Sequence, residues 1–197
     1  DSVSVLKALD NVSLQLPGGK FIAVVGANGS GKSTFLRHLN GLLQAESGFV
    51  RVEGLDPASE DDLREVRRRY GMVFQNPENQ NVGTTVEEDI AFGLENLGVE
   101  RSEMEERITA VLEELDMSEL RTHAVAELSG GQKQKLAIAS VLVMEPRGFL
   151  LDEVTAMLDP QTRESFLDLI RRLMVERELS VFHVTHHMDE VMQADYC

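Results

Sequence analysis

Short apolar runs alternate along this chain with longer segments in which apolar and polar residues recur at helical spacing. Apolar runs of about four to eight residues, rich in β-branched side chains, are typical of buried strands. Such runs occupy residues 21–26, 48–52, 70–74, 148–153 and 179–186. Helical patterns lie between them at residues 32–43, 59–69 and 159–174. The alternation predicts an α/β fold with a mostly parallel sheet flanked by helices.

The segment 76–128 interrupts this alternation, because it contains helical patterns only. Two helices are predicted there, at residues 85–98 and 102–117. We therefore expect an all-helical subdomain at 76–128, inserted between two segments of the sheet-containing core, residues 1–75 and 129–197.

Polar residues at the predicted helix starts support these boundaries. In a capping box, a Ser or Thr side chain and an acid or amide three residues later satisfy each other's free backbone N–H groups. Ser59 is expected to cap one core helix, and Asp159, followed by Pro160 at the first helical position, another. Capping boxes in the helical segment are predicted for Thr85 with Glu88 and for Ser102 with Glu105.

Composition and charge narrow the classes of partner. The chain has 197 residues, a length that fits one domain or one domain with a sizeable insert. Of these residues 42% are apolar and 27% charged, which is typical of a globular protein. Its net charge of −15 repels nucleic-acid phosphates and anionic lipid, so we expect no nucleic-acid partner. Cys197 is the only cysteine, which excludes a disulfide framework. No apolar run approaches the roughly 20 residues that span a bilayer, so a membrane link would need a partner protein.

The strongest motif follows the first predicted strand and opens a helix. Gly26-x-x-x-x-Gly31-Lys32-Ser33 matches the P-loop pattern, in which backbone N–H groups and a helix start surround a phosphate. Lys32 is expected to reach the β- and γ-phosphates, Ser33 to ligate Mg²⁺, and Thr34 to contact the α-phosphate. The candidate nucleotide-binding residues of this motif are Gly26, Asn28, Gly29, Ser30, Gly31, Lys32, Ser33 and Thr34.

A pair of acids ends the apolar strand at 148–153. A buried strand rarely finishes on two carboxylates unless a positive group lies beside them. Beside a P-loop, Asp152 is expected to hold Mg²⁺. Glu153 is expected to act as general base, or to orient the water that attacks the γ-phosphate.

A second candidate anion site lies about a hundred residues downstream of the P-loop, in the stretch ELSGGQKQKLAIAS. Ser129 is predicted to cap a helix in a box with Gln132, and such a helix start presents free N–H groups and a partial positive charge. Gly130 and Gly131 weaken a helix, and a cap alone does not require them. The pair of glycines therefore favours a binding role.

LSGGQ, together with the P-loop and LLDEVTAMLDP, is similar to the ATP-hydrolysing subunit of ABC transporters. The stretches VFQNPENQ and VTHH match two further motifs of that family. The resemblance implies a P-loop NTPase fold. It also implies that Gln75 contacts Mg²⁺ or the attacking water, that His186 senses the γ-phosphate, and that Asp159 contacts the partner. Two subunits would pack head to tail as a homodimer or a heterodimer, with each ATP between one P-loop and the partner's Ser129, Gly130, Gly131 and Gln132.

Within this family, QNPENQNVGTTVEEDIAFGLENLGV resembles the energy-coupling-factor branch, which imports vitamins and transition-metal ions in prokaryotes. The resemblance implies integral membrane partners and a place at the cytoplasmic face of the membrane. The acidic run 87–89 predicts that the partner's docking helix carries arginine or lysine. Departures from the family pattern at Val154, Met157 and Lys135 remove no catalytic group.

Two other functions stay open at this point. One is a soluble ABC ATPase for DNA repair, chromosome organisation or translation, against which the short insert and the net negative charge argue. The other is a module that binds ATP without hydrolysing it, against which Lys32, Glu153 and His186 argue. Relative to the family we also expect truncation at both ends, including the strand whose aromatic side chain stacks on adenine.

Overall fold

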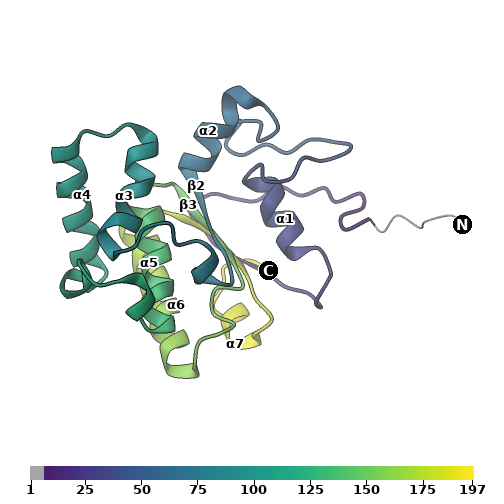
Figure 1. The fold of residues 1–197 in the computed structure, drawn as a ribbon. Coiled ribbons are helices and arrows are strands. Elements are labelled where there is room, and N and C mark those ends of the chain that lie inside the picture. The colour runs from purple at the N-terminus through teal and green to yellow at the C-terminus, as the bar shows by residue number, and fades with distance from the viewer. Residues whose placement is uncertain (1–6) are drawn as a thin grey trace, which may run out of the picture.

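The computed structural model describes residues 7–197, so the first six residues of the predicted core segment lie outside the described residues. Figure 1 shows a central sheet between two groups of helices. The strands are β1 (Phe21–Val24), β2 (Tyr70–Val73), β3 (Gly148–Asp152) and β4 (Ser180–Val184). The helices are α1 (Lys32–Leu39), α2 (Glu60–Arg69), α3 (Val86–Leu97), α4 (Arg101–Glu114), α5 (Gly130–Leu142), α6 (Pro160–Glu176) and α7 (Met188–Val191), with single 3₁₀ turns η1 (Pro77–Asn79), η2 (Ser118–Leu120) and η3 (Val125–Glu127).

All pairings between these strands are parallel, in the order β1-β4-β3-β2. Helices α1 and α2 lie on one side of the sheet, and α5 and α6 lie on the other, with α3 and α4 farther out (Figure 1). A parallel strand needs a long crossover to reach its neighbour, and helices provide it here. The predicted fold class, a mostly parallel sheet flanked by helices, is confirmed.

Alternate residues of each strand enter two separate hydrophobic clusters, because successive side chains point to opposite faces of a sheet. Phe149 and Leu151 pack in the cluster shared with α3 to α6, whereas Leu150 packs in the cluster shared with α1 and α2. All three side chains are fully buried. Burial on both faces explains why the strands appear in the sequence as unbroken apolar runs.

The predicted strand at 48–52 is wrong. Among the described residues, this segment makes only an isolated bridge between Val52 and Leu55. Glu53 and Gly54 between them have φ values of 49° and 85°, which close a tight turn instead of extending a strand. Phe49 is 82% exposed, so the apolar run does not mark burial here.

The helical segment 76–128 contains only helical elements and one isolated bridge among its described elements. The capping box of α3 is confirmed, since Thr85 Oγ1 accepts from Glu88 N at 3.3 Å and Glu88 Oε2 accepts from Thr85 N at 3.1 Å. The box predicted at Ser102 is wrong, because α4 begins at Arg101 and Ser102 lies inside its first turn. The Glu105 carboxylate accepts from Arg121 at 2.6 Å instead.

Of the two caps predicted for core helices, one forms and the other does not. Asp159 caps α6 as predicted, accepting from the backbone N–H groups of Gln161 and Thr162 at 3.1 Å. Hydrogen bonds from Thr162, and then from Gln161, lower the pKa of the Asp159 carboxyl. Ser59 occupies the N-cap position of α2, but its side chain makes no capping bond.

The acidic run 87–89 makes contacts within the chain. Glu87 pairs with Arg121 at 2.7 Å, and this bond lowers the pKa of Glu87. Glu88 completes the capping box of α3. Asp89 is buried and accepts from the backbone N–H of Val82 at 2.7 Å. The run therefore stabilises α3 and the loop before it.

Candidate active site

The candidate catalytic residues gather at one edge of the sheet, because parallel strands bring their carboxyl ends to the same edge. β1 leads into the P-loop at 25–31, and β3 ends on Asp152. β2 leads into Gln75, and β4 leads into residues 185–187. The segments that follow the four strands therefore meet at this edge although they are far apart in the sequence.

Lys32, at the first position of α1, is held inside the turn that precedes it. Its side chain is 6% exposed, and Nζ donates to the carbonyl oxygens of Gly26 at 3.0 Å and Ala27 at 3.1 Å. Gly31 has a φ of 95°, and a Cβ there would meet the Ala8 carbonyl oxygen at 2.5 Å. The close fit therefore requires glycine at Gly31. The result is a tight loop that ends in a helix start, with a buried ammonium group at its centre.

Ser33 and Asp152 are brought together although they are 119 positions apart in the sequence. Ser33 Oγ donates to Asp152 Oδ1 at 2.6 Å, and Asp152 is 5% exposed. A hydroxyl and a carboxylate are the hard oxygen ligands that Mg²⁺ prefers. This donor pair therefore fits a magnesium ion beside bound phosphates.

Glu153 has a strained backbone. Its φ is 53°, in the left-handed region that non-glycine residues seldom adopt, and its N–H donates to the Val184 carbonyl at 3.2 Å. Strain of this kind collects at functional sites, where the surrounding structure stabilises it. The carboxylate lies 3.8 Å from Lys32 Nζ, so the acid and the lysine face each other.

Ser33, Asp152 and Glu153 line a cleft of about 690 Å³. Its walls are formed by Ser33, Arg37, Phe74, Gln75, Asn76, Gln80, Asp152 and Glu153. The sequence prediction missed Arg37, Phe74, Asn76 and Gln80. Arg37 could have been found, because it follows Ser33 by one helical turn and shares its face of α1.

Gln80 holds the Gln75 loop in place. Its Oε1 accepts from Phe74 N at 2.7 Å, and its Nε2 donates to the Met72 carbonyl at 3.2 Å. The side chain therefore continues the hydrogen bonding of β2 beyond its end. No pattern in the sequence indicates this role, since it depends on the path of the loop.

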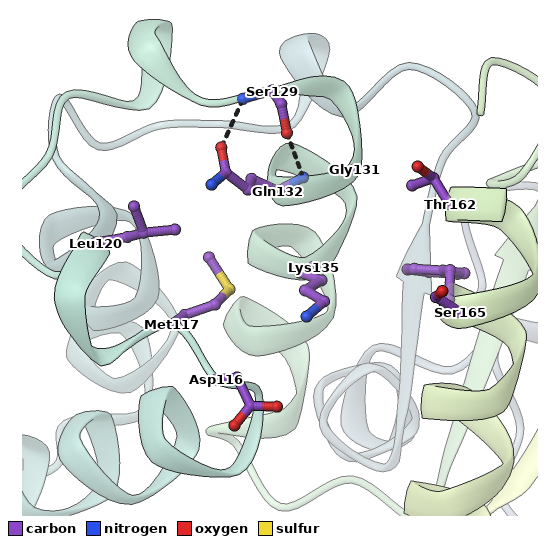
Figure 2. A pocket seen from close by; sticks show the side chains of 10 residues that line it. Asp116, Met117, Leu120, Ser129, Gly131, Gln132, Lys135, Thr162 and Ser165 are labelled. Carbon is purple, nitrogen blue, oxygen red and sulfur yellow. Dashed lines mark hydrogen bonds between the residues drawn. The ribbon is translucent and has the colours of Figure 1, made fainter. Parts of the chain in front are cut away.

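The start of α5 forms a separate pocket of about 260 Å³, shown in Figure 2. The predicted capping box is confirmed, because Ser129 N donates to Gln132 Oε1 at 2.8 Å and Gln132 N donates to Ser129 Oγ at 3.3 Å. Thr162 and Ser165 of α6 lie across from this helix start (Figure 2). Asp116, Met117 and Leu120 close the other side.

The two candidate anion sites lie in different pockets. The pocket at α5 and the cleft at the P-loop share no lining residue in the described part of the chain. Asp159 and His186 are exposed, and neither lines the cleft. The His186 ring lies 4.2 Å from that of His187, between ring centres.

Helix α5 does contact the Gln75 loop. Gln134 Nε2 donates to the Gln75 carbonyl at 3.3 Å, and Lys133 Nζ pairs with Glu78 of η1 at 2.6 Å. Hydrogen bonding to Lys133 lowers the pKa of Glu78. The helix that begins with Ser129 is thus linked to the loop that lines the cleft.

None of the helices in residues 7–197 has the length and apolar character that crossing a bilayer requires.

A family model and individual related proteins assign this chain to the same family. The ABC transporter family model matches residues 9–156. The energy-coupling factor transporter ATP-binding protein EcfA1 of Latilactobacillus sakei is 46% identical over 188 residues, covering 95% of this chain and 67% of that protein. EcfA1 of Symbiobacterium thermophilum is 51% identical over 188 residues, covering 95% of this chain and 66% of that protein. The chain thus spans about two thirds of the length of these relatives.

A solved structure of similar fold comes from a protein of an ABC transporter. It is described as cbiO1 from Clostridium perfringens, part of the ABC transporter complex cbiONQ. It superposes with a TM-score of 0.88 at 33% identity, covering 95% of this chain and 76% of that one.

Proposed function

This chain belongs to the ABC transporter family, and on that premise we propose that it is an ATP-binding and hydrolysing subunit. It dimerises around ATP and drives import of a vitamin or a metal ion through integral membrane partners. Its similarity to EcfA1 proteins supports ATP-driven transport through membrane partners and points to the energy-coupling-factor type. The proposed location is the cytoplasmic face of a prokaryotic membrane, with no nucleic acid involved.

One observation carries the hydrolytic part of the proposal: Ser33 of the P-loop motif lines one cleft together with Asp152, the last residue of β3, and Glu153, which follows it. Lys32 lies 3.8 Å from Glu153, and Ser33 bonds to Asp152 at 2.6 Å. A P-loop alone explains phosphate binding. The adjoining carboxylates add a magnesium ligand and a base, which hydrolysis needs.

The P-loop residues would hold the triphosphate. Backbone N–H groups of 27–34 would donate to phosphate oxygens, and the start of α1 adds its partial positive charge. Lys32 would exchange its carbonyl partners for the β- and γ-phosphates, because anionic oxygens bind an ammonium group more strongly than carbonyls do. Ser33, Asp152 and Gln75 would hold Mg²⁺. When bound, the ion supplies positive charge that stabilises the phosphate oxygens during transfer.

Glu153 would orient the attacking water and accept its proton. The water oxygen forms a bond to the γ-phosphorus while the bond from that phosphorus to the β,γ-bridging oxygen breaks, which releases ADP and phosphate. Gln75 would help to hold the water, and His186 would contact the γ-phosphate. Because His186 is exposed and does not line the cleft, this role requires its side chain to turn toward bound nucleotide.

The second half of the site would come from another subunit. Ser129, Gly130, Gly131 and Gln132 of one chain would grip the γ-phosphate held by the P-loop of its partner, and Asp159 would contact that partner. Separation of the two pockets within one chain supports this arrangement. The partner chain is a second copy or a sister subunit.

Phosphate release and nucleotide binding test the catalytic assignment. Glu153→Gln should reduce Mg²⁺-dependent ATP hydrolysis by at least about 100-fold, a loss within the range for a general base, while ATP affinity stays within about threefold. Lys32→Ala should abolish binding. Glu46→Gln, at an exposed acid away from the cleft, should behave as the unmodified protein. Equal hydrolysis by the Glu153→Gln and Glu46→Gln proteins would refute the assignment.

Co-purification from host membranes tests the transport part separately. Cysteines placed at Gln75 and Val82 should crosslink to an integral membrane protein. Crosslinks that reach soluble proteins alone would contradict transport while leaving the hydrolytic assignment intact.

A further inference from the structure

A buried carboxylate lies behind the segment that carries His186. Glu190, in α7, has no exposed surface. Its Oε2 accepts a hydrogen bond from His183 Nε2 at 2.8 Å and another from the Thr185 hydroxyl. Arg163 Nε lies 3.9 Å from its other oxygen. His183 and Thr185 are also buried, so this is a polar cluster within the core.

Burying this carboxylate is costly, and its partners offset the cost. Burial alone raises the pKa of Glu190, but bonds from His183 and Thr185 outweigh it and hold the pKa at about 2. Buried ion pairs seldom increase stability over apolar side chains of the same volume, and they can instead fix one arrangement of the chain. A buried cluster of this kind can fix the position of the segment bonded to it.

That segment is the switch loop, residues 185–187, which contains His186. Thr185 Oγ1 donates to Glu190 and accepts from His187 N at 3.0 Å. The N–H groups of Glu190 and Val191 both donate to the His187 carbonyl. Thus both neighbours of His186 are bonded to Glu190 or to Thr185, whereas His186 itself stays exposed.

The same carboxylate contacts a second functional segment. Arg163 lies in the first turn of α6, where its backbone N–H donates to the Asp159 carbonyl at 2.9 Å. Glu190 thus lies between the switch loop and the start of α6, the two segments that carry His186 and Asp159.

We propose that Glu190 is a positioning residue for His186: through Thr185 it fixes both flanks of the switch loop, and through Arg163 it sets that loop against the start of α6. The inference rests on the proposed hydrolytic function. Glu190 touches neither nucleotide nor water in this role. It determines where His186 stands when the γ-phosphate is present.

Thr185 provides the sharpest test, because valine keeps its shape and removes only the hydroxyl. Thr185→Val should lower kcat for ATP about tenfold, in line with the cost of a small misplacement of a catalytic group, and leave KM within about twofold. Thr185→Ser, which keeps the hydroxyl, should retain kcat within about twofold. In a His186→Ala background, Thr185→Val should lower kcat by less than about twofold more, because the two residues act through one group. Glu190→Gln should follow the same pattern.

Ser180→Ala is the matched control. Ser180 is buried at the opposite end of β4, where its Oγ accepts from Gly19 N at 2.9 Å. Ser180→Ala removes this hydrogen bond, which is comparable to that of Thr185 and lies far from the switch loop, so kcat should not change. A tenfold loss in Ser180→Ala, or multiplicative losses from Thr185→Val and His186→Ala, would overturn the proposal.

A readout without hydrolysis separates this inference from the proposed function. In the protein with labelled histidines, Thr185→Val should shift or broaden the NMR signals of the His186 ring, and Ser180→Ala should leave them unchanged. Absence of ATPase activity in the unmodified protein would defeat the proposed function, and these signals would still decide the positioning role. Unchanged His186 signals in Thr185→Val would refute it.

Discussion

Two adjacent glycines at the start of α5 have different surroundings. A Cβ at Gly131 would lie 2.7 Å from Thr162 Cγ2, whereas a Cβ at Gly130 would meet nothing within 4 Å. At Gly131 the glycine therefore permits the close approach of α5 and α6. At Gly130 no packing reason requires glycine, so the binding role proposed for this helix start remains the better account of it.

Gly131→Ala should lower the free energy of unfolding by about 1–3 kcal/mol, because the new methyl group overpacks the contact with Thr162. Gly130→Ala should stay within about 1 kcal/mol of the unmodified protein or stabilise it, since alanine favours a helix. Urea unfolding measures both.

Thr162→Ser removes the opposing methyl group and should restore at least half of the loss in Gly131→Ala. Equal destabilisation by the two glycine variants would show that backbone freedom, and not packing, explains Gly131.

At the scale of elements, α3 and α4 show that a capping pattern in the sequence forms a capping box only where no other partner binds its side chains. Both helices carry a Ser or Thr followed by Glu three residues later, and only α3 uses it. Arg121, which lies beyond α4, donates to the Glu105 carboxylate of that helix at 2.6 Å. Helix α4 begins one residue before Ser102. Arg121 also binds Glu87 of α3, so it links the two helices.

Thr85→Ala should destabilise the protein by about 1 kcal/mol, because it removes the acceptor for Glu88 N at the start of α3. Ser102→Ala should be neutral or slightly stabilising, since it replaces serine with a better helix former inside a first turn. Thermal or urea unfolding of the two variants side by side measures the difference. A loss at Ser102 as large as that at Thr85 would mean that α4 uses the predicted cap in solution.

At the scale of the whole molecule, the two candidate anion sites, which lie in different pockets, predict a nucleotide-dependent dimer. Glu153→Gln should bind ATP without hydrolysing it, so bound ATP would hold two subunits together. Size-exclusion chromatography should then show a dimer with ATP and a monomer with ADP, which lacks the bridging γ-phosphate. Adding Ser129→Arg should abolish the dimer by crowding the helix start, and adding Ser47→Arg, in an exposed loop, should not.

The monomer carrying Ser129→Arg should still bind ATP, because its own P-loop is intact. Adding Lys32→Ala instead should lose both binding and dimer. If Ser129→Arg weakened ATP binding by the monomer as much as Lys32→Ala does, the two motifs would form one site within one chain.

The sequence by itself determined the features whose causes lie within a few residues. These features are the P-loop turn, the acids at and after the end of β3, and the caps at Thr85, Ser129 and Asp159. They follow from backbone geometry and from hydrogen bonds between residues two or three positions apart. The parallel sheet followed from apolar runs buried on both faces. Local chemistry decides such features, so a pattern of neighbouring residues is sufficient to find them.

Only the tertiary structure decided which distant groups meet. It placed Ser33 against Asp152 and buried Glu190 beside His183. It also brought the Gln80 side chain to the end of β2, where it accepts from Phe74 N. Among residues 7–197 it also left 48–52 without a neighbouring strand, and it gave the acids 87–89 partners within the chain. Each outcome depends on which of several possible partners the folded chain brings within hydrogen-bonding distance. Spacing along the sequence carries no record of that choice.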